Sequence, residues 1–171
     1  MKKGILAGSF DPITNGHVWL IQKAADMIAA MDGQLIVVIG HNPAKKYLFS
    51  KDERFSQVSN VLKNNLPAEL FNRIKIQVVS NDFLISHAQN EHASFIIRGI
   101  RNSEDFQYEN QLLQINRKID SSIETVFFIT PPDMSEVSSS TVKGLVGFNN
   151  WEQIVSQYVD PVIIDAFRKK I

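Results

Sequence analysis

Apolar residues gather in five short runs along the chain, and several of these runs are apolar throughout rather than at every second position. The runs are rich in Ile, Val and Phe. Continuous apolarity over a short run is typical of strands that are buried on both faces, as in a parallel sheet. We therefore predict strands over Gly4–Ala7, Leu35–Gly40, Ile74–Val79, Phe95–Arg98 and Thr125–Thr130.

Helical periodicity fills the stretches between the predicted strands. In the first predicted helix, from Val18 to Met31, the apolar residues fall on one stripe. A second helix begins near Ser50, because Ser50 and Glu53 have capping-box spacing. A third helix runs roughly from Phe83 to His92 and a fourth from just after Ser103 to about Ile119, with Glu104 and Asp105 in its first turn. The predicted buried stripes are Leu20, Ile21, Ala24, Ala25 and Ile28 in the first helix and Phe55, Val58, Val61 and Leu62 in the second.

The tail after Ser138 has a helical pattern only. Asn150 with Gln153 is predicted to cap one segment, and Asp160-Pro161 opens another with proline at the first helical position. Alternation of strand and helix upstream of this tail predicts a single-domain, doubly wound α/β fold with a five-stranded parallel sheet and C-terminal helices, spanning residues 1–171. Such sheets bind ligands beyond the carboxyl ends of their strands.

Composition narrows the functional classes. Lys and Arg together number 18, as do Asp and Glu, so the basic excess of a general nucleic-acid binder is missing. The chain has no cysteine, which excludes disulfides and thiolate metal sites. The first apolar run is too short for a signal peptide or a membrane span. We therefore expect a cytoplasmic protein without a nucleic-acid or membrane partner.

Four of the predicted strand ends carry residues suited to binding anions. They are Gly8 to His17 after the first strand, His41 to Lys46 after the second, Arg98 to Arg101 at the fourth, and Pro131 to Thr141 after the fifth. Backbone N–H groups near Gly8 and a following helix start could hold a phosphate, and Gly16 permits close approach because it has no Cβ. An Arg that ends an apolar strand must reach solvent or meet an anion.

Each of these segments also has a structural interpretation. The first can be a turn, Lys45 and Lys46 a solvated pair, and the serines an N-cap. His41, His87 and His92 lack metal-ligand spacing, and neither GxGxxG nor GxxxxGK[ST] occurs. Taken together, the segments describe a polyanion site with many donors and no evident nucleophile. This combination favours phosphoryl or nucleotidyl transfer, in which positioning and charge stabilisation dominate.

The motif Thr14-Asn15-Gly16-His17 resembles the [HT]-x-G-H signature of the nucleotidyltransferase superfamily. Arg98-Gly99-Ile100-Arg101 and Ser138-Ser139-Ser140-Thr141-Val142-Lys143 resemble two further blocks of the bacterial phosphopantetheine adenylyltransferases. The match runs in register from about residue 3 to residue 145. Tyr47 stands where this family often has Pro, Met134 where an aromatic residue is common, and the stretch from Lys63 to Arg73 is longer.

The resemblance implies a Rossmann-like fold and transfer of AMP from ATP to 4′-phosphopantetheine, giving dephospho-coenzyme A and pyrophosphate. It implies that His17 is catalytic, that Mg²⁺ accompanies ATP without a metal site on the protein, and that the chain forms a homohexamer. The acceptor-binding residues implied are Ser9, Lys45, Leu84 and Arg98. The ATP-binding residues implied are Ser9, Phe10, His17, Gly99, Ile100, Arg101, Glu109, Met134, Ser135, Glu136, Val137, Ser138, Ser139 and Ser140.

Two alternatives stay open from the sequence. Within the superfamily, the chain could be a nicotinate- or nicotinamide-mononucleotide adenylyltransferase or a small cytidylyltransferase, although the Lys-Lys pair and the Arg98-to-Arg101 block argue against both. Outside it, the chain could be a nucleotide-binding module without activity, like a flavodoxin. Lys45 and Arg98 leave different strands at one edge of the sheet, so we expect them to converge on one phosphate.

Overall fold

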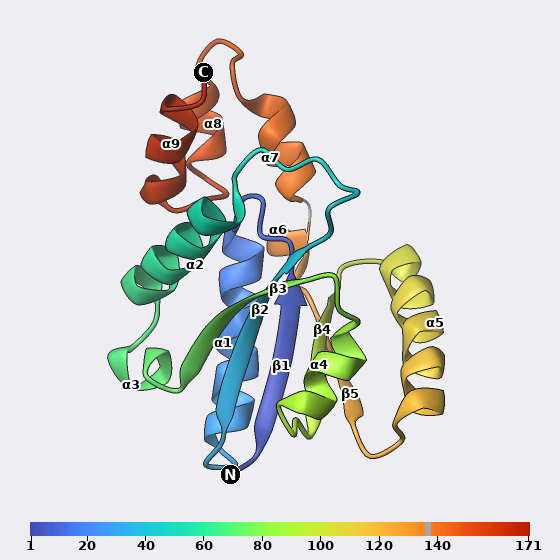
Figure 1. The fold of residues 1–171 in the computed structure, drawn as a ribbon. Helices are drawn as coiled ribbons and strands as arrows, with labels where there is room; N and C mark the ends of the chain where they lie inside the picture. Colours follow the sequence, from blue (N-terminus) through green and yellow to red (C-terminus); the bar gives the residue numbers. More distant parts are fainter. Residues whose placement is uncertain (136–137) are drawn as a thin grey trace.

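A computed structural model describes residues 1–135 and 138–171 and shows a five-stranded sheet in which every neighbouring pair is parallel (Figure 1). The strand order is β3-β2-β1-β4-β5, so the predicted doubly wound sheet is confirmed. Each strand ends within two residues of its predicted bounds. The strands are β1 (Lys3–Gly8), β2 (Gln34–His41), β3 (Ile74–Ser80), β4 (Phe95–Ile100) and β5 (Glu124–Ile129).

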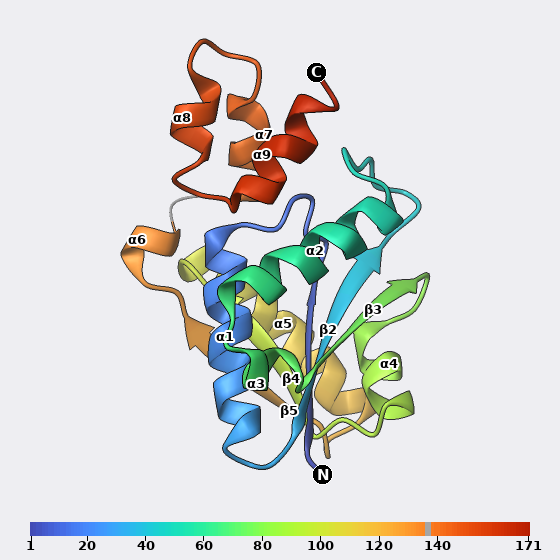
Figure 2. The same ribbon diagram turned by 90° about the vertical axis from the view of Figure 1, so that its left-hand side faces the viewer.

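Helices cover both faces of the sheet (Figures 1 and 2). On one face, α1, α2 and the C-terminal helices share a core with Leu6, Val37 and Ile97, and on the other α4 packs against Ile5 and Val38. The central strands are therefore buried on both sides, which explains their continuous apolarity. The helices are α1 (Asn15–Ala29), α2 (Lys51–Asn65), α3 (Ala68–Phe71), α4 (Leu84–Asn90), α5 (Ser103–Ile119), α6 (Pro132–Ser135), α7 (Ser139–Leu145), α8 (Trp151–Val155) and α9 (Pro161–Arg168).

The helix starts test the capping predictions. Ser50 and Glu53 form the predicted capping box of α2, and the Asp160 side chain accepts a hydrogen bond from the Val162 N–H at the start of α9. The prediction for Asn150 is wrong in part. Asn150 does precede α8, but its backbone is left-handed (φ 61°) and its side chain makes no capping bond, because in that conformation its carbonyl oxygen accepts from the Gln153 N–H instead.

The buried stripe of α2 also differs from the prediction. Val58, Val61 and Leu62 are buried as expected, but Phe55 is 41% exposed. Arg54, a charged residue, takes its place in the stripe and is fully buried. Its Nη1 donates to two backbone carbonyls, which offsets part of the cost of burying the charge, although its Nε is buried without a hydrogen-bond partner.

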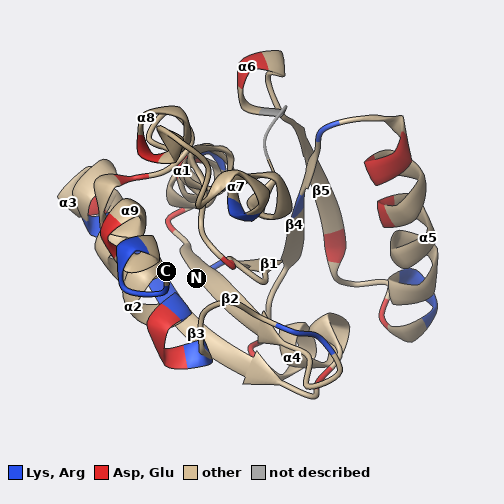
Figure 3. Cartoon of the chain, turned by 90° about the horizontal axis from the view of Figure 1, so that it is seen from above, with Lys and Arg blue, Asp and Glu red and all other residues tan. Residues whose placement is uncertain are grey.

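The β1–β4 ladder is shorter than its neighbours. Its register ends at Leu6 and Ile97, although β1 continues against β2 to Gly8 and β4 continues against β5 to Ile100. The two strands lie where the strand order reverses, which is the position at which doubly wound sheets bind ligands. Helices α7, α8 and α9 lie beyond the carboxyl ends of the strands, with α8 and α9 on the side of α1 and α2 (Figures 1 and 3). No helix within the described residues is long and apolar enough to cross a membrane.

Candidate active site

Two cavities open at the carboxyl edge of the sheet, one on each side of the end of β1. The first measures about 490 Å³ and the second about 330 Å³, and among the described residues Ala7 lines both. The first is lined mainly from β2, the loop after it and the segment before α4. Its predicted site residues are Ser9, Lys45 and Leu84. Those of the second are Phe10, His17, Arg98, Gly99, Arg101, Glu109, Met134, Ser138, Ser139 and Ser140.

The loop after β1 packs a side chain against the end of its own strand. Phe10 has a left-handed backbone (φ 46°), which costs energy for a residue with a Cβ and is often found at functional sites. Its buried ring lies so close to Gly8 that a Cβ on Gly8 would meet it at 2.9 Å. The same ring meets the His17 ring edge-on, with centroids 5.1 Å apart. The loop thus orients His17 by packing.

His17 is fixed in one tautomer by Thr14. The Thr14 N–H donates to His17 Nδ1 at 3.1 Å, and Thr14 Oγ1 lies 2.9 Å from the same nitrogen. Because Nδ1 accepts, the proton of the neutral ring is on Nε2, at the side away from Thr14. Burial, with a smaller contribution from the positive charge of Arg101, lowers the pKa of His17 to about 4. His17 is therefore a neutral hydrogen-bond donor at pH 7.

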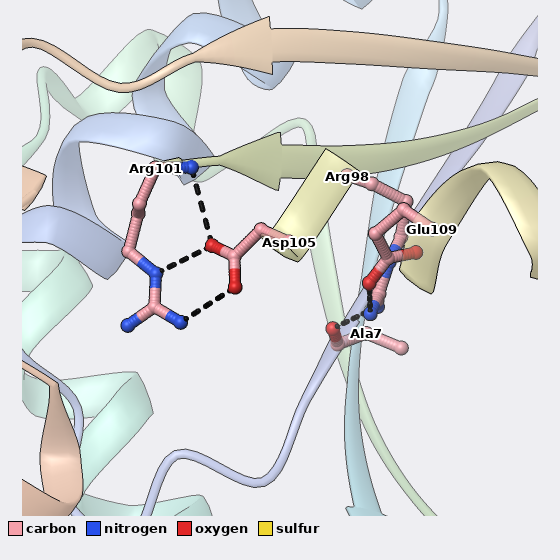
Figure 4. Close-up of polar contacts among 5 residues, drawn as sticks. All are labelled: Ala7, Arg98, Arg101, Asp105 and Glu109. Atoms are coloured by element: carbon pink, nitrogen blue, oxygen red, sulfur yellow. Dashed lines mark hydrogen bonds and ion pairs between the residues drawn. The ribbon is translucent and has the colours of Figure 1, made fainter. Parts of the chain in front are cut away.

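Arg98 fills the point where β1 and β4 separate (Figure 4). Its Nη1 donates to the Ala7 carbonyl at 2.9 Å, replacing the ladder bond that the separated strands cannot make. Glu109, from α5, is buried and accepts from Arg98 Nε at 2.8 Å and from Nη2. This two-point ion pair fixes the guanidinium beside the residue that both cavities share.

Arg101 is held in the same way at the mouth of the second cavity (Figure 4). Asp105, in the first turn of α5, accepts from Arg101 Nε at 2.8 Å, from Nη2 at 3.1 Å and from the backbone N–H at 3.2 Å. The hydrogen bonds from Arg101 lower the pKa of Asp105 and those to Asp105 raise the pKa of Arg101. The pair is partly exposed, so the guanidinium has donors left for an anion.

The three serines Ser138, Ser139 and Ser140 have different roles. Ser138 caps α7 by accepting from the Thr141 N–H at 3.1 Å, as predicted for one of them. Ser139 donates to the Pro12 carbonyl at 2.8 Å and so fastens α7 to the loop after β1. Ser140 is exposed and also lines the second cavity. Gly16 allows the backbone of α6 to approach closely, because a Cβ at this position would meet the Met134 carbonyl at 3.0 Å.

The structure separates two residues that we expected to meet. Lys45 lines the first cavity and the Arg98 guanidinium lines the second, with Ala7 between them. The reason is that Glu109 and the Ala7 carbonyl hold Arg98 on the α5 side of β1. Arg98 nevertheless donates to the Ala7 carbonyl, so its guanidinium lies at the junction of the cavities.

The remaining predicted residues lie elsewhere. Ile100 ends β4 with its side chain buried, and it lines neither cavity. Ser135 ends α6. Glu136 and Val137 lie outside the described residues.

Several residues that support the site were not predicted. Thr14 was only part of a motif and Asp105 only a first-turn acid, although both contacts, at three and four residues' separation, are short enough for sequence spacing to signal them. His41 and His87 were assigned no role, yet both line the first cavity. No local spacing links them, because His41 ends β2 whereas His87 lies in α4, 46 residues further along the chain.

Asp11 joins three elements beneath the site. It is buried, accepts from the Leu48 and Phe49 N–H groups at 3.0 and 2.9 Å, and forms an ion pair with Lys143 of α7 at 2.7 Å. Burial raises the pKa of Asp11, but the hydrogen bonds and charge of Lys143 and the two backbone donors outweigh it, so the pKa lies below its usual value. No group of three or more His, Asp or Glu that could hold a metal ion occurs within the part of the chain that the structure describes.

Comparison with known proteins places this geometry in context. The cytidylyltransferase-like family profile matches residues 5–145. The chain is 40% identical to the phosphopantetheine adenylyltransferase of Chromobacterium violaceum over 95% of its own length and 93% of that protein. It is 37% identical to the protein of the same name from Lactobacillus acidophilus, over 100% of its length and 98% of the relative.

Solved structures resemble the chain in fold. A Plasmodium falciparum nicotinic acid mononucleotide adenylyltransferase complexed with NaAD aligns with a TM-score of 0.72 at 19% identity, covering 99% of this chain and 96% of the other. A universal stress protein in complex with cAMP aligns at 0.51 and 14% identity, covering 76% of this chain and 98% of the other. At these identities the likeness is one of fold alone.

Proposed function

The chain belongs to the phosphopantetheine adenylyltransferases, within the cytidylyltransferase-like family, and from this premise we propose how its two cavities carry out adenylyl transfer. The reaction of this enzyme class joins the AMP part of ATP to 4′-phosphopantetheine, giving dephospho-coenzyme A, with release of pyrophosphate. The observation that supports the assignment of substrates is the meeting of two donor-rich cavities at Ala7.

We assign the acceptor to the first cavity and ATP to the second. The first cavity contains Lys45 and Ser9 for a phosphate and Leu84 for an apolar arm. The second contains His17, Arg101 and the serine block, which together suit a triphosphate. Arg98 touches Ala7 and would meet the acceptor phosphate where the cavities join.

In the proposed reaction, a phosphate oxygen of phosphopantetheine attacks the α-phosphorus of ATP in line. A new P–O bond forms, the bond from the α-phosphorus to the β-phosphate oxygen breaks, and pyrophosphate leaves with the bonding electrons. The attacking phosphate is already an anion near neutral pH, so no general base is needed. Lys45 and Arg98 would offset the charge of the nucleophile. His17 Nε2–H and Arg101 would stabilise the charge that grows on the transferred and leaving oxygens.

We also propose the conditions under which the enzyme works. Mg²⁺ would enter as part of the Mg·ATP substrate and be held by the phosphates, since hard phosphate oxygens are its preferred ligands. Because ATP is the proposed substrate, we place the reaction in the cytoplasm. We propose a homohexamer, which is supported by an apolar stripe on α5: Tyr108, Ile115 and Ile119 are at least 53% exposed and follow one helical face.

Pyrophosphate release tests the function. Purified protein is incubated with Mg·ATP and one acceptor at a time: 4′-phosphopantetheine, nicotinate mononucleotide or nicotinamide mononucleotide. In a further incubation, CTP replaces ATP and a phosphorylated alcohol is the acceptor. We expect pyrophosphate only with phosphopantetheine. Release with a mononucleotide would assign the chain to a neighbouring branch. Tight ATP binding without release from any acceptor would identify a binding module and overturn the proposal.

A further inference from the structure

Arg54 is a buried cation that forms no ion pair with any carboxylate in the described residues. Its Nη1 donates to the carbonyls of Ser9 at 2.6 Å and Gly40 at 3.0 Å. Its Nη2 lies 3.0 Å from His41 Nδ1, and the guanidinium carbon is 4.1 Å from the centre of the Tyr47 ring. A buried Arg usually has a carboxylate partner, so its place here needs an explanation.

All four residues that Arg54 contacts line the first cavity, although Arg54 itself does not. The guanidinium therefore lies directly behind the cavity wall, and Arg keeps its charge at neutral pH. Lys45 adds a second positive charge from the rim, whereas Asp82 is the sole carboxylate among the described lining residues. The cavity wall thus has an excess of positive charge on the side of Ser9 and His41, which suits an anionic group.

His41 is oriented from two sides. Since an Arg can only donate, His41 Nδ1 must accept, and the ring proton is therefore on Nε2. The imidazole stacks on Tyr47 with centroids 5.1 Å apart and an angle of 29°, and the Asn42 N–H anchors the Tyr47 hydroxyl at 3.0 Å. Nε2 has no hydrogen-bond partner among the described residues, and the ring lines the cavity. A donor without a partner among the described residues is thus held in a fixed direction in the cavity that Lys45 also lines.

We propose that His41 is a further binding residue of the first cavity and donates its Nε2–H to the phosphate monoester of the acceptor. Arg54 and Tyr47 are positioning residues that fix its tautomer and its plane. This assignment rests on the proposed function, which places the acceptor in this cavity. It also gives a physical role to Tyr47, one of the two residues that depart from the family pattern, because both Arg54 and His41 stack on its ring.

Calorimetric titration without ATP tests this proposal, because binding is then measured apart from catalysis. Wild type, His41→Phe and His41→Gln are each titrated with 4′-phosphopantetheine and with unphosphorylated pantetheine. Phe can keep the stacking on Tyr47 but has no donor, whereas the Gln amide nitrogen lies near the position of Nε2. We expect His41→Phe to weaken phosphopantetheine binding roughly ten- to a hundred-fold, the usual effect of losing a hydrogen bond to a charged group. Pantetheine binding should change less than about two-fold, and His41→Gln should retain most of the affinity.

A second pair of variants tests the positioning role. Tyr47→Leu removes both ring contacts and should selectively weaken phosphopantetheine, whereas Tyr47→Phe keeps the rings stacked and should lose little. Equal loss for both ligands in His41→Phe, or no loss at all, would overturn the proposal while leaving the proposed function intact. Failure of wild type to bind phosphopantetheine would overturn both. Unchanged ATP affinity and melting temperature serve as the check on folding.

Discussion

At the scale of single residues, the site depends on side chains whose donors are fixed before a ligand arrives. His17, which lines the second cavity, shows this most clearly, because Thr14 occupies Nδ1 and leaves Nε2 as the ring donor. A donor aimed at developing charge needs no reorganisation during the reaction. Asn and Gln substitutions separate the two ends of the imidazole, since Asn reaches the position of Nδ1 and Gln that of Nε2.

We predict that His17→Asn folds normally and loses ~100- to 1,000-fold in kcat, the usual effect of removing one such donor. His17→Gln should retain more turnover than His17→Asn. The affinity for ATP should fall much less than kcat in both variants. Steady-state kinetics with saturating substrates measure the effect, and melting curves report on folding. Near-native turnover in His17→Asn would remove His17 from the mechanism.

The lowered pKa of His17 also predicts a pH dependence of stability. Burial holds the native pKa at about 4, whereas an unfolded His titrates near its model value of 6.5. Between these values the unfolded chain binds a proton that the native chain does not, so the free energy of unfolding falls as pH decreases from about 6.5 towards 4. We expect urea unfolding of wild type to show this loss and His17→Gln to show less of it. Equal slopes for the two proteins would contradict the assignment.

At the scale of elements, one carboxylate ties the first loop to two helices. Asp11 accepts from the backbone N–H groups of Leu48 and Phe49, just before α2, and from Lys143 of α7, so it sets how α7 packs beside the second cavity. The pKa of Asp11 is lowered, and its contribution to stability is therefore present above the unfolded value of 3.8 and is lost as pH falls through the native value.

We predict that Asp11→Asn lowers the free energy of unfolding by roughly 2–4 kcal/mol. This loss is smaller than is usual when a fully buried ion pair is broken, because Lys143 is partly exposed. An Asn side chain has one acceptor oxygen for three donors. Lys143→Met should lower the free energy of unfolding by less, since the Asp11 carboxylate still accepts hydrogen bonds from the two backbone N–H groups. Chemical denaturation of both single variants and of the double variant measures the coupling. Additive losses would show that the ion pair does not join these elements.

The sequence predicted these elements well where the information is local. Continuous apolar runs located all five strands, and Ser50 with Glu53 located the start of α2. Arg54 could not be predicted in the same way. Its partners lie 45 and 14 residues away, and the helical pattern favoured Phe55 for the buried face. The same limit applies to Arg98, whose fixed position depends on Glu109 in the next helix.

At the scale of the whole molecule, α5 presents an apolar stripe that the sheet does not cover. Tyr108, Ile115 and Ile119 are exposed there, and burial between subunits would remove them from water. Under the proposed assembly, wild type should have six times the monomer mass in light scattering. Ile115→Lys with Ile119→Lys should dissociate it into smaller species, because charges would be buried at the contact.

Gln114→Lys is the matched control for that experiment. It adds a charge to the same helix at an exposed polar position on a different helical face, and it should leave the assembly intact. A monomeric wild type, or an unchanged mass in the doubly substituted variant, would show that this surface does not hold subunits together. Circular dichroism of the variants substituted in α5 checks that the helix persists.

The shared position of Ala7 has a consequence for inhibitor chemistry. Since Ala7 is the residue common to both cavities among those described, a single compound that fills both would pass the methyl group of Ala7. Its linker can therefore be short, and two weak fragments joined there would gain effective concentration without new contacts. A larger side chain at Ala7 should abolish that gain and leave the binding of each separate fragment to its own cavity much less affected.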